Sequence, residues 1–140
     1  MPVTLNHTIL HVRNKADTGA FLTELLGLPP PRALAHFLVV QIGETSLDLI
    51  ETDGEISPRH FAFLVSEAEF DEIFARLREL GLPYWADPFH REPGAINHWD
   101  DGRGVYFDDP NGHLLEIITR PYGSGGHSAQ NPNPLLGRPA

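Results

Sequence analysis

The sequence contains no cysteine. This absence excludes a disulfide framework, a thiolate nucleophile and a zinc site with cysteine ligands. Basic residues are also scarce, since 10 Lys and Arg stand against 19 Asp and Glu, and the formal net charge is −9. A chain of this charge is repelled by phosphate backbones and by anionic lipid, so we expect neither nucleic acid nor a membrane as a partner.

Long apolar runs are missing as well. No segment approaches the ~20 apolar residues of a membrane-spanning helix, and residues 1–12 lack the basic region and apolar core of a signal peptide. The 140 residues are 41% hydrophobic and 21% charged, which is typical of a globular domain with one core. We therefore expect a cytoplasmic protein with one domain.

Each half of the chain shows the same order of predicted elements. In the first half, alternating and helical patterns predict a strand, a helix that ends at Gly27 and a hairpin: 4–12, 14–27, 36–42 and 46–51. In the second half, Ser66 and Glu69 form a capping box that begins a helix after the first strand. The strands expected there are 60–65, 83–86, 103–108 and 113–119.

The two halves also align in sequence. LNHTILHV aligns with PRHFAFLV and places His7 on His60, while SLDLIET aligns with LLEIITR and places Asp48 on Glu116. Coincident histidine and acidic positions argue against chance similarity and indicate an internal repeat. Each repeat, about 4–52 and 59–120, is then a βαβββ motif.

These repeats predict an α+β fold in which two paired βαβββ motifs form a curled, barrel-like sheet around a metal cavity. Residues 1–121 make up this single domain. Residues 122–140 are rich in Gly and Pro, and we expect them to form a tail that is either disordered or draped over a partner. Curved sheets leave edges to cover, so we expect a homodimer.

Four chemically active side chains are predicted to share one concave face. Side chains alternate along a strand, which puts His7, His60, Asp48 and Glu116 opposite the helix-covered positions. A buried carboxylate is costly unless it is paired or bound to a cation. Two imidazoles and one carboxylate can hold a divalent ion and leave positions open for substrate. We predict His7, His60 and Glu116 as metal ligands, with Asp48 either a fourth ligand or a partner of a ligand histidine.

Further candidates lie near this face. Tyr106 is either a substrate contact or a core residue, and His98, in the loop 88–102, is either an acid–base residue or a solvated side chain. His11 shares the face of His7, where it could either support a metal ligand or contact substrate. Arg103 and Arg120 are candidates for binding an anionic substrate.

Three segments together resemble the vicinal oxygen chelate superfamily, which includes glyoxalase I, extradiol dioxygenases, fosfomycin-modifying enzymes and bleomycin-resistance proteins. They are LNHTILHV, HFAFLV before the capped helix, and VYFDDPNGHLLEIIT. The resemblance covers residues 4 to about 120. It implies metal ligands in the first strand, in the strand that opens the second repeat and in the last strand, at the positions of His7, His60 and Glu116. Asp48 falls where some members have a fourth ligand, usually Glu.

The resemblance implies a divalent-metal-dependent enzyme whose small substrate chelates the ion through adjacent oxygens. With Fe2+ we expect dioxygenase-like chemistry, and with Zn2+, Ni2+ or Mn2+ glyoxalase-like or lyase-like chemistry; the short side chain of Asp48 favours the former. DDGRGVYF lacks the Ser-rich potassium-binding loop of the fosfomycin-modifying enzymes.

The alternative is a non-catalytic antibiotic-binding protein, with a planar ligand stacked in the same cavity between aromatic residues, namely Trp85, Phe89, Trp99 and Tyr106. A binder should keep its ligand affinity after Glu116→Ala, whereas a metalloenzyme should lose both metal and activity.

Overall fold

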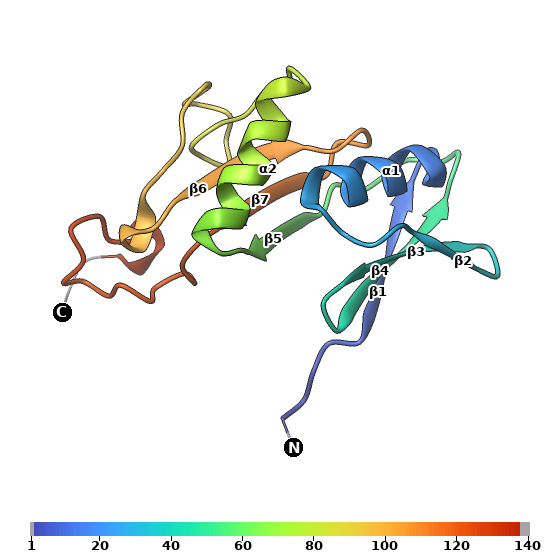
Figure 1. The fold of residues 1–140 in the computed structure, drawn as a ribbon, viewed down its shortest axis with the longest axis horizontal. Coiled ribbons are helices and arrows are strands. Elements are labelled where there is room, and N and C mark those ends of the chain that lie inside the picture. The colour runs from blue at the N-terminus through green and yellow to red at the C-terminus, as the bar shows by residue number, and fades with distance from the viewer. Residues whose placement is uncertain (1, 138–140) are drawn as a thin grey trace. The chain divides into compact units, whose positions relative to one another are not determined.

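The structure, a computed structural model, describes residues 2–137 and divides into two compact units. Unit 1 extends to Pro58 and includes the turn 109–112, and unit 2 comprises residues 59–108 and those from His113 onward. Each unit contains one sheet and one α-helix (Figure 1). The α+β class is therefore confirmed. The strands form two separate sheets, and their closure into a barrel-like sheet stays a prediction.

Unit 1 has the predicted βαβββ order. Its elements are β1 (His7–Val12), α1 (Lys15–Leu26), β2 (Arg32–Leu34), β3 (Phe37–Ile42) and β4 (Thr45–Glu51). The sheet order is β1-β4-β3-β2, with β1 parallel to β4, and α1 packs against β3 and β4. The βαβββ motif requires the short edge strand β2, but no range was predicted for it, because its three residues are all exposed and carry no apolar alternation.

Helix α1 ends at Gly27, as the sequence predicts, and begins after a cap at Asn14 that was not predicted. The Asn14 side chain accepts the backbone N–H of Asp17, and Gly27 ends the helix in the left-handed conformation, with φ of 70°. Gly19, inside the helix, lies close to β3, since a Cβ there would be 2.7 Å from Leu38 Cδ2. The absence of a side chain thus lets helix and sheet approach closely.

Unit 2 repeats the pattern with one difference. Its elements are β5 (His60–Leu64), α2 (Glu67–Glu79), the 3-10 turn η1 (Trp99–Asp101), β6 (Gly104–Asp108), β7 (Leu114–Ile118) and the 3-10 turn η2 (Pro134–Leu136). The sheet order is β5-β7-β6. The strand expected at 83–86 is wrong: Trp85 alone bridges to Tyr106 and Pro93. Pro83 and Pro93 have no N–H to donate, which limits pairing to one residue.

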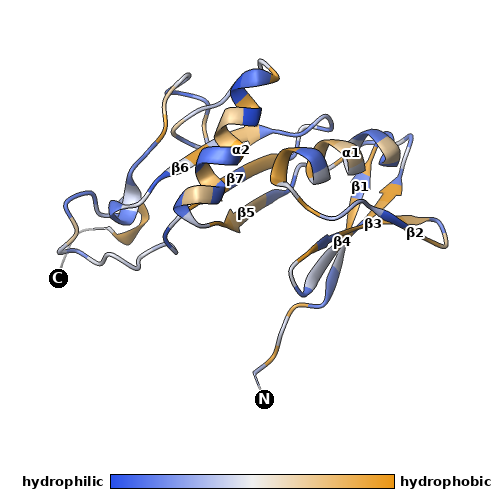
Figure 2. Ribbon diagram, in the orientation of Figure 1, coloured by the Kyte–Doolittle hydropathy of each residue, from blue (hydrophilic) through white to orange (hydrophobic). Residues whose placement is uncertain are grey.

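Hydrophobic residues concentrate in the strands of both sheets, whereas α2 has alternating polar and apolar positions (Figure 2). On α2 the buried residues are Phe70, Ile73 and Leu77, spaced as one face of a helix requires. Ser66 and Glu69 form the predicted capping box through reciprocal hydrogen bonds of 3.1 and 2.9 Å. Helix α2 is therefore fixed both by its cap and by its buried face.

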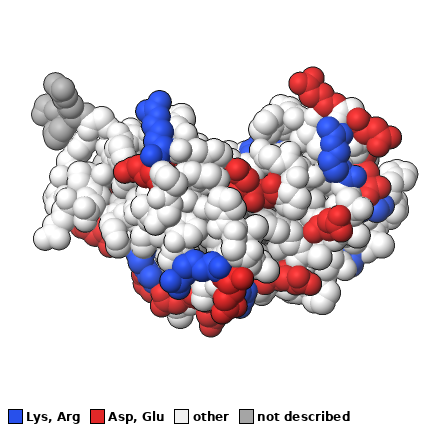
Figure 3. All heavy atoms as spheres, turned by 90° about the horizontal axis from the view of Figure 1, so that it is seen from above, with Lys and Arg blue, Asp and Glu red and all other residues white. Residues whose placement is uncertain are grey.

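Charged side chains lie on the surfaces of both units. On the face shown in Figure 3, acidic residues are widespread and the basic residues lie beside them rather than forming a separate basic surface. Between residues 2 and 137, neither helix has the length and hydrophobicity that crossing a bilayer requires.

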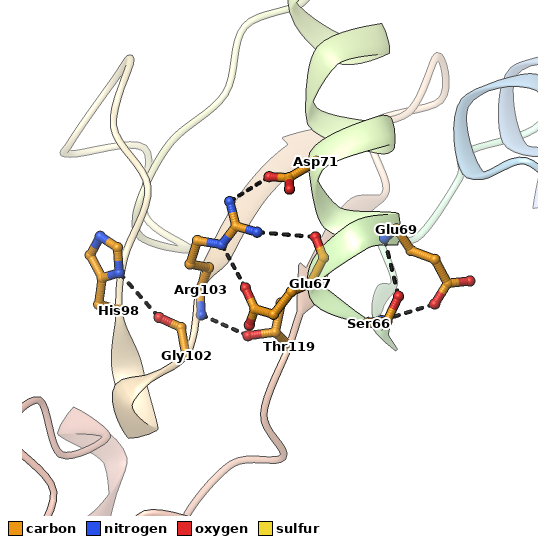
Figure 4. A network of polar contacts seen from close by, with 8 residues as sticks. All are labelled: Ser66, Glu67, Glu69, Asp71, His98, Gly102, Arg103 and Thr119. Atoms are coloured by element: carbon orange, nitrogen blue, oxygen red, sulfur yellow. Dashed lines mark hydrogen bonds and ion pairs between the residues drawn. The ribbon is translucent and has the colours of Figure 1, made fainter.

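Arg103, a candidate for binding an anionic substrate, is instead engaged with α2 (Figure 4). Its guanidinium donates to Glu67 Oε1 at 2.7 Å and to Asp71 Oδ1 at 2.8 Å, and it lies 4.4 Å from the centre of the Phe70 ring. Hydrogen bonds from Thr119 and Arg103 hold the pKa of Glu67 below its ordinary value. The arginine therefore fastens the start of β6 to α2.

We expect Arg103→Met to lower the free energy of unfolding by about 1 kcal/mol near neutral pH, through the lost ion pairs and cation–π contact. Because the pKa of Glu67 is lowered by folding, its contribution is present above its unfolded pKa and is lost as the pH falls from about 5 to about 3. The difference from wild type should shrink over that range in urea titrations. A difference that stays constant with pH would contradict this assignment, and Arg76→Met, which breaks an exposed pair with Glu72, is the control.

Candidate functional site

Strand β7 places Glu116 at the centre of the unit 2 sheet. Glu116 pairs with Ala62 of β5 on one side and with Tyr106 of β6 on the other. His60 lies two residues before Ala62 and therefore projects from the same face of the sheet as Ala62 and its partner Glu116. In β5 exposure alternates as predicted, with His60 exposed and Phe61 partly covered.

Glu116 is a fully buried carboxylate whose two oxygens have different partners. Its side chain is 0% exposed, and Oε1 lies 3.1 Å from His60 Nε2. Oε2 accepts a hydrogen bond from the Tyr122 hydroxyl, which is itself hydrogen-bonded to the Tyr106 hydroxyl. Burial raises the pKa of Glu116, although the tyrosine hydroxyls and His60 oppose it. Burial likewise raises the pKa of Tyr106 and of Tyr122, so both phenols remain protonated donors.

The ring of His60 is oriented by a main-chain contact. Its Nδ1 lies 3.0 Å from the carbonyl oxygen of Leu114, which can only accept, so Nδ1 carries a hydrogen. In the neutral ring, Nε2 then directs its lone pair at Glu116 Oε1. Two such atoms at 3.1 Å require a proton or a cation between them. Ligands bound at ~2.1 Å and at right angles on one ion would be ~3.0 Å apart, so this pair fits a metal ion.

In unit 1, His7 and Asp48 have the same strand register as His60 and Glu116 have in unit 2. His7 lies opposite Ser46 of the parallel strand, two residues before Asp48, just as His60 lies opposite the residue two before Glu116. The two histidine and acid pairs therefore occupy equivalent register positions in the two sheets.

Within unit 1 the two side chains line one cavity of about 430 Å3. His7 is exposed and its Nδ1 lies 2.7 Å from Asn6 Oδ1. Asp48 is 8% exposed and accepts a hydrogen bond of 2.9 Å from Ser46 Oγ. Among residues 2–137, no group of three or more acidic or histidine side chains suited to a metal ion is gathered. The predicted ligands are thus brought together as pairs, and the complete set stays a prediction.

The other candidate residues occupy different surroundings. Tyr106 is 2% exposed and stacks on the His60 ring with centroids 6.0 Å apart. His98 is exposed, and its Nδ1 donates to the Gly102 carbonyl oxygen at 3.1 Å (Figure 4). His11 lies on β1 of unit 1. Tyr106 directly adjoins the His60 and Glu116 pair, and the functional roles of all three stay predictions.

Tyr122 was not predicted as a site residue. It lies in the segment 122–140, where Gly and Pro give no periodic pattern, so no sequence signal distinguishes it. Two aspartates hold this segment on unit 2. The Asp100 carboxylate accepts the N–H groups of Gly123 and Gly125, both at 3.1 Å, and Asp101 accepts the N–H of Asn131 at 2.8 Å. Residues 138–140 lie outside the described residues.

Unit 2 contains a cavity of about 350 Å3 that is lined in part by Tyr106. Its lining is mainly apolar and aromatic, and it also includes the charged residues Asp87, Arg91 and Glu92. The apolar and aromatic lining residues are Pro88, Phe89, Trp99, Tyr106, Pro134 and Leu135. Phe89 is 71% exposed and Leu135 is 75% exposed, so apolar surface is available at its mouth. Trp85, expected among the lining aromatics, instead stacks on His90 at 3.8 Å between centroids.

Comparisons with known proteins agree with this architecture. A family model described as the Glyoxalase/Bleomycin resistance protein/Dioxygenase superfamily matches residues 4–117. The solved structure of a protein named Oxidase ChaP-H2 is 57% identical, with a TM-score of 0.87, covering 90% of this chain and 100% of that one. Oxidase ChaP-H1 is 54% identical with a TM-score of 0.85, covering 87% of this chain and 99% of that one. A metallothiol transferase FosB from Shouchella clausii is 39% identical over 122 residues, 82% of this chain and 79% of its own.

Proposed function

This chain belongs to the glyoxalase/bleomycin resistance protein/dioxygenase superfamily and is an enzyme of that group, and on that premise we propose that it uses a divalent metal ion to act on a small substrate with adjacent oxygen atoms. The observation that carries the proposal is the pairing of His60 Nε2 with Glu116 Oε1 at 3.1 Å. A fully buried carboxylate facing an imidazole lone pair is the donor arrangement that a divalent ion neutralises.

His7 is proposed as the third ligand, supplied by unit 1 of the same chain or of a second copy in a homodimer. Its equivalence to His60 in the repeat supports this assignment. Asp48, in the position equivalent to Glu116, has one oxygen bonded to Ser46 and is proposed either as a fourth ligand or as a partner of His7.

The cavity beside Tyr106 supports an aromatic or otherwise flat apolar body for the substrate. Trp99 and Tyr106 offer ring faces and edges in its lining, and aromatic contacts of this kind favour planar ligands. Since Tyr106 also stacks on His60, a ligand in the cavity would contact a residue that adjoins the proposed metal ligands. His98 and His11 are proposed as acid–base or substrate-contacting residues.

The oxidative branch of the family's chemistry is the function proposed here. When bound, the divalent ion supplies Lewis acidity to the substrate oxygens, and iron(II) also makes reaction with dioxygen available. Around it, His60 is held by its Nδ1–H bond to Leu114, and Glu116 by the Tyr122 hydroxyl. The 57% identity to a protein named as an oxidase supports this branch. Thiol transfer is the second candidate, favoured by the 39% identity to a metallothiol transferase.

Metal analysis of untagged protein, purified without added metal, tests the proposal. We expect about one equivalent of iron per chain, lost in His7→Ala. Protein that has been handled anaerobically should consume oxygen when oxygen and a catechol are added. Uptake of zinc, nickel or manganese, with thiol consumed in the presence of fosfomycin, would favour the second candidate. Failure to bind any of these ions, even on titration, would overturn the proposal.

A mixing experiment identifies the source of His7. His7→Ala and Glu116→Ala proteins are unfolded together, refolded and assayed for metal. If a homodimer shares each site between two chains, random pairing restores about a quarter of the sites. If each site belongs to one chain, mixing restores none.

A further inference from the structure

The C-terminal segment, residues 121–137, contributes one side chain to the surroundings of Glu116. The Tyr122 hydroxyl donates to Glu116 Oε2 and is hydrogen-bonded to the Tyr106 hydroxyl. Its ring packs edge-on against Trp99, with centroids 6.1 Å apart. Glu116 Oε1 is left facing His60 Nε2. One oxygen of the carboxylate is therefore engaged by the protein, and the other is directed at the histidine.

This division matters for how the carboxylate can bind a cation. A carboxylate whose two oxygens are both available can ligate an ion through one oxygen or through both. With Oε2 held by a phenolic hydroxyl, Oε1 is the oxygen that remains. Ligation through one oxygen leaves one more coordination position for substrate, as catalytic metal sites require.

The segment that carries Tyr122 is hydrogen-bonded to two aspartates whose own backbone is strained. Asp100 and Asp101 have φ of 60° and 59°, a left-handed conformation that costs roughly 1–2 kcal/mol per residue. Their carboxylates accept main-chain N–H groups from residues 123–131. A Cβ on Gly125 would lie 3.1 Å from Asp100 Cα, so the segment approaches the strained turn closely. These contacts stabilise one path for the segment and with it the place of Tyr122.

We propose that Tyr122 is a positioning residue of the metal centre, whose hydroxyl engages Glu116 Oε2 so that the carboxylate ligates through Oε1 alone. The inference rests on the proposed function, because it requires Glu116 to be a metal ligand. It assigns a role at the site to the C-terminal segment, outside the repeats that supply the ligands.

Cobalt(II) titration of the metal-free, full-length protein tests the inference. Tyr122→Phe removes the hydroxyl and keeps the ring against Trp99. We expect its dissociation constant for Co2+ to rise about 10- to 100-fold, and the visible absorption of the Co2+ form to change as Oε2 enters the coordination sphere. Tyr84→Phe is the matched control, since the Tyr84 ring packs edge-on against Phe74, and it should leave both measurements unchanged.

Each outcome has a definite meaning. If wild type binds Co2+ and Tyr122→Phe gives the same affinity and spectrum, the positioning role is wrong and the proposed function stands. If wild type binds no Co2+, the proposed function fails and the inference fails with it. Amide hydrogen exchange over residues 121–137 should be unchanged in Tyr122→Phe, and a general loss of protection there would overturn the inference in favour of a structural role.

Discussion

Glu116→Gln should lower the affinity for the divalent ion by at least about 100-fold, more than the loss expected for a residue that only supports a ligand. The neutral amide has no charge to offer the ion, yet it matches the carboxylate in size. Its oxygen can accept from the Tyr122 hydroxyl, and its NH2 group can donate to His60 Nε2, which lies 3.1 Å from the present Oε1. The variant therefore keeps the local hydrogen bonds.

The stability of metal-free Glu116→Gln separates loss of the ligand from loss of the fold. Burying a charged carboxylate is costly unless it is fully paired, and the Glu116 side chain is 0% exposed. We therefore expect the variant to unfold at the same urea concentration as wild type or at a higher one. Glu72→Gln, on the exposed side of α2, is the matched control and should bind metal normally.

Metal content, oxygen uptake and ligand binding are measured on the same preparations. Stoichiometric metal in Glu116→Gln would remove Glu116 from the ligand set. Under the non-catalytic alternative, a planar ligand would bind Glu116→Ala as tightly as wild type, and neither protein would consume oxygen. Loss of metal and oxygen uptake together is the result expected here.

The register of the candidate site could be predicted because it depends on local rules. Alternation along strands fixes which side chains share a face, and the internal repeat fixes which positions correspond. These two rules placed Asp48 and Glu116 at equivalent points, each on the strand beside its histidine. Helix boundaries followed similarly from the Ser66 cap and from Gly27.

Features that depend on irregular backbone could not be predicted. The sequence around Trp85 has the aromatic content of a strand, but prolines limit it to single bridges. Tyr122 reaches Glu116 only because a non-repetitive segment folds back, and Gly- and Pro-rich composition does not encode such a path. That His7 completes the set of metal ligands also stays a prediction. Alternation along a strand specifies the face of the sheet on which His7 lies, but it does not specify which other side chains that face approaches.

Asp100→Ala should release the C-terminal segment from unit 2. The Asp100 carboxylate is 1% exposed and accepts the N–H groups of Gly123 and Gly125, and the Asn133 amide lies within 3.4 Å of it. Its removal leaves these partly buried donors without their acceptor, at about 1–3 kcal/mol for each group that water does not reach. It also places alanine at φ of 60°, where aspartate is tolerated better.

We expect the free energy for opening residues 121–137 to fall by about 3 kcal/mol, which corresponds to roughly 100-fold faster amide exchange. Asp101→Ala is the comparison variant, because Asp101 is also left-handed but exposed, and its effect on exchange should be smaller than that of Asp100→Ala. Exchange in β1 and β4 of unit 1 should not change in either variant. Equal exchange of 121–137 in wild type and Asp100→Ala would contradict the assigned role of Asp100.

The same variant connects the segment to the metal centre. Opening of residues 121–137 withdraws the Tyr122 hydroxyl from Glu116 Oε2, so Asp100→Ala should weaken Co2+ binding at least as much as Tyr122→Phe does. Two consecutive left-handed aspartates persist in a fold only when surrounding contacts over-determine them. Because those contacts come from the segment that carries Tyr122, the strain at Asp100 and Asp101 and the geometry of the Glu116 carboxylate are expected to change together.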